Sequence, residues 1–303
     1  MNGVLRSMLE GVIDYAGLFP PAKLPLGEAI NEYLAIMGGP NRWLVDRFAC
    51  PVGKLPDLAI ELAEHPEEPF IPVSVIGTIQ PDHKHWKHGL EHDAAVMTKF
   101  VKDAENHAEI QAYEVRLPDH GHATEYVDDL RSFANIDLFA ELPWAPEMST
   151  SLATLAEGEV AFAKARAGGL EASAFPSSAQ LAEFIQQCAH LDLGFKLTAG
   201  LHHPLPARDE KLGVTMHGFL NVLVATALAG PEDLSTKELE EILNERSGEA
   251  FSFGRDTLTW RECKVGLEDV EYGRSLLVSF GSCSVQEPVD GLAEIGLMEM
   301  AGK

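Results

Sequence analysis

Lysine side chains lie inside two short apolar segments of this sequence, where a charged amine is costly unless an anion meets it. The segment L-G-F-K-L-T-A-G carries Lys196 in its middle, and F-A-K-A-R-A-G-G carries Lys164 and Arg166 two residues apart. Residues two apart on a strand point to the same face of a sheet, so Lys164 and Arg166 share a face. The two segments therefore aim cations at one side of a sheet.

The same spacing places charged or hydroxyl side chains on further predicted strands. Arg47 lies in W-L-V-D-R-F-A-C, and Glu114 and Arg116 share one face of I-Q-A-Y-E-V-R-L-P. Glu141 lies in D-L-F-A-E-L-P-W, and Thr198 shares a face with Lys196. If each of these faces points into the interior of one closed sheet, five cationic side chains and two carboxylates meet at the same end of that sheet. This excess of cations predicts a phosphate or carboxylate ligand.

A lysine that is crowded by cations and partly desolvated has a lowered pKa, which provides a neutral amine as nucleophile or base. We expect Lys196 to be a Schiff-base nucleophile or general base, and Glu114 or Glu141 to move protons. The substrate anion is expected to be bound by the other polar strand residues: Arg47, Arg116, Lys164, Arg166 and Thr198. The alternative is a buried ion-pair network that only supports the fold.

Two adjacent histidines follow the second lysine on a long loop, 201–215, of the length that lids and binding loops often have. We expect His202 or His203 to close over the substrate or to act in acid–base chemistry. A metal site that also uses His217 stays open, but adjacent histidines on an extended chain point in opposite directions. No H-E-x-x-H motif is present. The sequence therefore predicts no metal ligands and favours no cofactor, with a divalent metal left open.

Other polar motifs carry further expectations. The histidines of H-K-H-W-K-H-G-L-E-H, residues 83–92, are expected on a solvated helix surface. Asp14 and Tyr15 are polar residues at the start of a predicted strand. They are expected either at the bottom of the fold, away from the site, or close to the charged residues of the predicted site. The turn F-G-S-C-S has small residues whose N–H groups can hold an anion. Its Cys283 has no histidine nearby in the sequence, which disfavours a nucleophilic role.

Composition excludes several functional classes. The chain has 303 residues and a formal net charge of −24, which opposes nucleic-acid binding. No apolar run is long enough to span a membrane, and the four cysteines are widely spaced without a C-x-x-C pair. We therefore expect a cytoplasmic protein whose partner is a small anionic metabolite, with homo-oligomerisation left open.

Short apolar strands alternate with amphipathic helices along the chain. The predicted strands are 13–18, 43–50, 70–77, 110–118, 136–144, 160–168, 194–200 and 250–253. The predicted helices are 26–37, 55–65, 82–105, 123–133, 149–156, 178–190 and 216–229. This alternation predicts an α/β fold with a parallel sheet, most simply a (β/α)8 TIM-type barrel. A doubly wound open sheet is the alternative, but its strands would read as continuous aliphatic runs.

We expect one barrel domain over residues 1–303, with an irregular C-terminal segment from about residue 232. The last fifty residues are candidates for strand eight, a hairpin and a closing helix, and the pattern leaves open which segment forms strand eight.

Several motifs resemble known families. D-Y-A-G-L-F-P-P, K-L-T-A-G-L-H-H-P, H-G-F-L-N-V and F-G-S-C-S resemble a group of bacterial proteins without an assigned activity, so this resemblance implies no function. K-L-T-A-G is similar to the K-T-S-T-G stretch of deoxyribose-phosphate aldolases, barrel enzymes whose lysine forms a Schiff base. K-A-R at 164–166 resembles the paired cations of quinolinate-type phosphoribosyltransferase barrels. Both imply a barrel with an anionic ligand.

The sequence thus predicts a lyase of aldolase type that acts on a small phosphorylated or carboxylated carbonyl compound. Three alternatives stay open. They are a Mg-dependent phosphoribosyl-type transferase, a metal-dependent hydrolase using the histidine loop, and a non-catalytic binder of an anionic metabolite.

Overall fold

Eight parallel strands form a closed barrel in this computed structural model, in the order β1-β13-β7-β6-β5-β4-β3-β2. The structure describes residues 3–64, 69–231 and 234–298. The barrel prediction is confirmed, and the doubly wound open sheet is wrong. The chain divides into two compact units, Ile13–Ala165 and a second unit formed by Met1–Val12 with Arg166–Lys303. A single domain over the whole chain stays a prediction.

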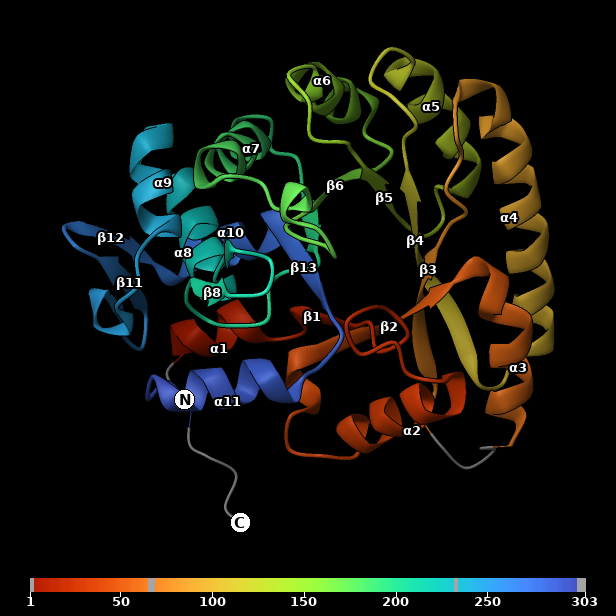
Figure 1. The fold of residues 1–303 in the computed structure, drawn as a ribbon, viewed down its shortest axis with the longest axis horizontal. Helices are drawn as coiled ribbons and strands as arrows, with labels where there is room; N and C mark the ends of the chain where they lie inside the picture. Colours follow the sequence, from red (N-terminus) through yellow and green to blue (C-terminus); the bar gives the residue numbers. More distant parts are fainter. Residues whose placement is uncertain (1–2, 65–68, 232–233, 299–303) are drawn as a thin grey trace. The chain divides into compact units, whose positions relative to one another are not determined.

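The first unit alternates strands with helices. Its strands are β1 Ile13–Tyr15, β2 Val45–Pro51, β3 Ile71–Ile76, β4 Ala108–Arg116, β5 Asp137–Glu141 and β6 Phe162–Arg166, the last residue of which belongs to the second unit. Its α-helices are α2 Leu26–Met37, α3 Leu55–Ala63, α4 His83–Asp103, α5 Ala123–Leu130 and α6 Met148–Gly158. Figure 1 shows α3, α4 and α5 on the outer side of β3 and β4.

The second unit contains two barrel strands, β7 Phe195–Thr198 and β13 Leu277–Ser282. Its helices are α1 Gly3–Leu9, α7 Ser178–His190, α8 Phe219–Ala229, α9 Thr236–Leu243, α10 Leu267–Leu276 and α11 Gln286–Glu294. Ser177 and Gln180 form a capping box at the start of α7, as the Pro-Ser-Ser sequence predicts.

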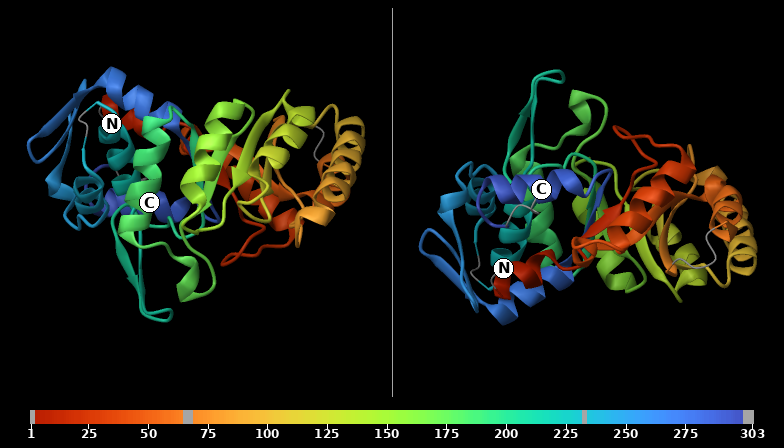
Figure 2. Two further views of the ribbon diagram at one scale, coloured as in Figure 1. Left: turned by 90° about the horizontal axis from the view of Figure 1, so that it is seen from above. Right: turned by 90° about the horizontal axis from the view of Figure 1, so that it is seen from below.

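The C-terminal segment resolves the open question about strand eight. Strand 277–282 closes the barrel, whereas the predicted strand at 250–253 becomes β10 of a small antiparallel sheet. That sheet consists of β10 Phe251–Phe253, β11 Thr257–Trp260 and β12 Cys263–Gly266. β11 and β12 pack against α10, as the views in Figure 2 show. The predicted start of this segment, 232–233, lies outside the described residues.

The long loop after β7 contains a second hairpin, of β8 Ala207–Asp209 and β9 Val214–Met216. Met216 therefore belongs to a strand, and the helix predicted to begin there begins at Phe219. The backbone amides of Phe219 and Leu220 donate to the carbonyls of His203 and Pro204, at 3.0 and 3.1 Å. These bonds satisfy amides at the helix start, which otherwise lack partners.

Apolar and polar residues alternate along the barrel strands as the period-two pattern predicts. In the second unit, Phe195 packs against Phe184 of α7 and Phe280 stacks on Phe219 of α8. Lys196, between the apolar residues of β7, therefore points away from these helices. The strand faces that meet the helices form the apolar core, and the opposite faces carry the polar residues.

Candidate functional site

A buried lysine between two buried glutamates forms the centre of the polar face in the first unit. The strand register pairs Glu141 with Lys164, and Glu114 lies on the same face of the adjoining strand. Lys164 Nζ lies 2.9 Å from Glu114 Oε2 and 2.8 Å from Glu141 Oε2. Ser74 Oγ donates to the other oxygen of Glu114 at 2.6 Å. Three of the predicted site residues therefore form one cluster.

This cluster fixes the charge of its lysine. Burial lowers the pKa of Lys164, but the carboxylates of Glu114 and Glu141 raise the pKa more, so the net shift is upward. The prediction of a lowered pKa and a neutral amine is therefore wrong for Lys164. Its ammonium group serves as the counter-ion of two carboxylates.

Arg47 is paired by carboxylates near the amino ends of the strands. One of its terminal nitrogens, Nη2, lies 2.5 Å from Asp137 Oδ2, and its Nε lies 3.5 Å from Asp46 Oδ2. Asp14 accepts a hydrogen bond from the backbone amide of Arg47 at 3.1 Å. Burial lowers the pKa of Arg47, and Asp14, Asp46 and Asp137 raise it more. The sequence argument for an excess of cations did not include the negative charge of these aspartates.

The two other predicted arginines are exposed at strand ends. The side chain of Arg116 is 45% exposed, and its Nε lies 4.0 Å from Glu141 Oε1. Arg166 is exposed at the end of β6. Both arginines are therefore exposed to solvent.

Lys196 and Thr198 lie on the polar face of the second unit. The register pairs them with Ser279 and Gly281 of β13. Lys196 is only 1% exposed. The hydroxyl of Thr198 is buried and has no hydrogen-bond partner among the residues described. A buried hydroxyl without a partner costs free energy, which a ligand group can recover.

The loop and helix after these two strands bring together His202, Cys283 and Glu287. His202 Nδ1 lies 3.1 Å from Glu287 Oε2. One donor atom from each of the three residues lies within 4.8 Å of the other two. Of this trio, sequence reasoning selected only the histidine. The spacing C-x-x-x-E in F-G-S-C-S-V-Q-E could have indicated Cys283 and Glu287 as neighbouring ligands, because it places both side chains near the start of one helix.

The other histidines of this region do not join that group. His217 is buried, and its Nε2 donates to the carbonyl of Pro176 at 2.9 Å. Burial lowers the pKa of His217, which favours the neutral ring. His203 is exposed. The metal set of His202, His203 and His217 that the sequence left open is therefore not the set that the structure assembles.

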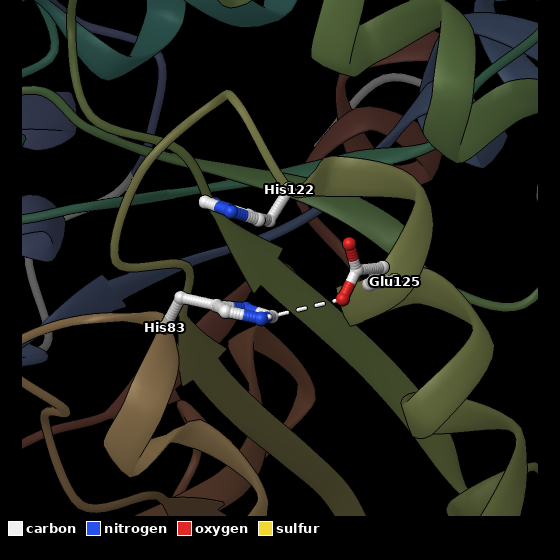
Figure 3. A group of neighbouring side chains, drawn as sticks. All are labelled: His83, His122 and Glu125. Atoms are coloured by element: carbon white, nitrogen blue, oxygen red, sulfur yellow. Dashed lines mark ion pairs between the residues drawn. The ribbon is translucent and has the colours of Figure 1, made fainter.

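A second group of possible ligands lies in the first unit, at the starts of α4 and α5. Figure 3 shows His83, His122 and Glu125 side by side. His83 Nε2 lies 3.3 Å from Glu125 Oε2, and the two imidazole rings stack with centroids 4.0 Å apart. His83 was expected to be solvated, but it is half-buried. The H-K-H and H-G-H motifs that contain these histidines could have indicated a group of possible ligands.

The closed barrel of parallel strands and helices places the chain in the (β/α)8 class, an architecture shared by many enzymes, aldolases among them. No protein-family model matches the chain, and no curated protein sequence is significantly similar to it. The family resemblances of the sequence motifs stay predictions. Among the described residues, no helix has both the length and the apolar character needed to cross a membrane.

Proposed function

We propose that the protein is a lyase of aldolase type that acts on a small anionic carbonyl compound through Lys196. The observation that carries this proposal is the position of Lys196. It is buried in β7, on the face turned away from the helices, two residues before a hydroxyl without a hydrogen-bond partner among the described residues. Active-site residues of (β/α)8 enzymes come from the carboxyl ends of the strands.

The other strand lysine is a poor candidate for the nucleophile. Lys164 is held as an ammonium ion by two carboxylates, so its amine is not available to attack a carbonyl carbon.

The proposed reaction begins with attack of the Lys196 amine on the substrate carbonyl carbon, and loss of water gives an iminium ion. A general base removes the proton of the substrate's β-hydroxyl, and the C–C bond breaks with its electron pair moving into the iminium. Arg166, in the same unit as Lys196, is the proposed contact for the substrate anion.

Borohydride trapping tests this proposal. The purified protein is incubated with a panel of keto acids and sugar phosphates, reduced, and mapped by peptide mass spectrometry. We expect one reduced adduct on Lys196, with none in Lys196→Arg. The matched control is Lys237→Arg, which changes an exposed lysine of the same unit and keeps the adduct. An adduct on Lys164, or none with any substrate of the panel, removes the Schiff-base mechanism.

A metal-dependent hydrolase is the second candidate function, because the structure brings His202 close to a thiol and a carboxylate. Hydrolysis that depends on added metal, with no adduct trapped by borohydride, would favour the hydrolase over the lyase. Ligand binding that survives Lys196→Arg without turnover would favour a non-catalytic binder. The phosphoribosyl-type transferase has no specific support among the contacts described.

The proposal includes the cytoplasm as the location of the protein and a small anionic metabolite as its partner. The net charge of −24 fits a partner other than nucleic acid.

A further inference from the structure

We propose that His202, Cys283 and Glu287 bind a zinc ion at the carboxyl ends of β7 and β13. All three residues belong to the second unit, and one donor atom from each lies within 4.8 Å of the others. The group combines an imidazole, a thiol and a carboxylate, which are the three ligand types that zinc accepts in proteins.

The chain after β7 turns sharply to present the histidine. Ala199 and Gly200 have positive φ angles of 65° and 75°, a conformation that glycine adopts most readily. A Cβ atom on Gly200 would lie 2.8 Å from the carbonyl oxygen of Ala167, so only glycine fits at that point. The following residue, Leu201, is buried and anchors the loop, and His202 comes next. The position of the histidine is therefore set by the backbone.

Hydrogen bonds hold the segment that carries the thiol and the carboxylate. Ser282 Oγ donates to the carbonyl of Ser284 at 2.6 Å, which closes a tight turn around Cys283. Ser284 Oγ accepts a hydrogen bond from the backbone amide of Glu287, in the first turn of α11, at 3.2 Å. Cys283 is only 7% exposed, so it is shielded from bulk solvent.

The separation of one pair of ligand atoms is close to that expected in a zinc site. Two ligand atoms at about 2.0–2.1 Å from a tetrahedral zinc lie about 3.3 Å apart. His202 Nδ1 and Glu287 Oε2 are 3.1 Å apart, so a zinc ion needs only a small widening of this pair. Ligand binding by the thiol requires its proton to leave, and zinc binding should therefore release a proton.

The His83, His122 and Glu125 group fits a metal less well. Its two imidazole rings are stacked with an angle of 9° between their planes. The lone pairs of imidazole nitrogens lie in the ring planes, so those of nearly parallel rings cannot converge on one ion unless a ring rotates. Figure 3 shows both rings in this stacked arrangement.

Three protein ligands leave the fourth position of a tetrahedral zinc open for water or a substrate oxygen, as in catalytic zinc sites. The zinc would then polarise an oxygen of a substrate bound near β7. This catalytic role rests on the proposed function, but the metal site itself does not.

Metal binding by the full-length protein tests the site without any substrate. After treatment with a chelator, the protein is titrated with Zn²⁺ and Co²⁺. We expect one tightly bound zinc per chain, release of a proton, and a sulfur-to-cobalt charge-transfer band in the cobalt protein. Cys283→Ser should lose the band. His202→Gln should weaken zinc binding by more than about tenfold, because the loss of a direct ligand should cost at least as much as the 10–100-fold typical of outer-shell changes.

Matched variants separate this site from its neighbours. Cys263→Ser and His203→Gln change the same residue types within the same unit and should keep the band and the affinity. His83→Gln reports on the stacked histidine pair and should also leave both unchanged. Circular dichroism of each variant establishes that it is folded.

Three results would overturn the proposal: no zinc binding at micromolar concentrations, a cobalt protein without the sulfur band, or a band that persists in folded Cys283→Ser. A failed borohydride experiment would leave these results untouched, so the two proposals fail independently.

Discussion

Pro204 of the loop after β7 packs directly against Gly291 of α11. A Cβ atom placed on Gly291 would lie 2.5 Å from Pro204 Cδ and 3.1 Å from its Cγ. Gly291 is four residues after Glu287, on the same side of α11, and Pro204 is two residues after His202. The missing side chain thus lets the histidine loop approach the helix that carries the carboxylate.

We expect Gly291→Ala to destabilise the protein by about 1–3 kcal/mol, because a rigid proline ring must move away. The same displacement should separate His202 from Glu287 and weaken zinc binding by about tenfold or more. Denaturant unfolding and zinc titration measure the two effects. Gly53→Ala is the control, since a Cβ atom there would meet nothing within 4 Å. Equal stabilities of the two variants would contradict this account of the contact.

Removing the Lys164 amine should destabilise the fold strongly. Lys164→Met leaves the carboxylates of Glu114 and Glu141 buried without their counter-ion, which typically costs about 3–5 kcal/mol. The triple variant that adds Glu114→Gln and Glu141→Gln should recover most of this loss. Lys99→Met removes an exposed helical ion pair with Asp103 and should cost less than about 1 kcal/mol. Chemical denaturation of the unchanged protein and these three variants measures their free energies of unfolding and checks this order.

His217 should make stability depend on pH below neutrality. Burial lowers the pKa of the folded His217, whereas the unfolded imidazole takes up a proton near pH 6.5. The contribution of this histidine is therefore fully present above about pH 6.5 and is lost as the pH falls toward the lower pKa of the folded state.

Each unit by which folding lowers this pKa is worth about 1.4 kcal/mol. We expect the free energy of unfolding to fall less between pH 7 and pH 5 in His217→Gln than in the unchanged protein. An identical pH dependence in both proteins would show that His217 does not titrate differently on folding.

Two buried thiols should resist modification in the folded protein. Burial raises the pKa of Cys50 to about 12 and places that of Cys188 well above its usual range. At pH 8, a pKa of about 12 lowers the thiolate fraction on the order of 1,000-fold relative to an ordinary cysteine. Mass spectrometry after mild alkylation should find Cys263, which is partly exposed, modified first. Rapid labelling of Cys50 before unfolding would contradict its burial.

The sequence determined the architecture because strand and helix periodicities are local. Alternation of apolar and polar residues predicted strands around Lys164 and Lys196, and Ser177 marked the start of a helix. The last strand could not be assigned in this way. Both 251–253 and 277–282 read as short apolar runs, and only long-range pairing decides which of them joins the barrel.

For the polar residues, the sequence by itself determined which strand positions carry charge, because the face of each side chain follows from its place in the alternation. The tertiary structure alone decided which charges neutralise one another. Asp137 lies 90 positions from Arg47, and Glu287 lies 85 positions from His202. Electrostatic pairing depends on distance in space, and no local pattern encodes contacts across such separations.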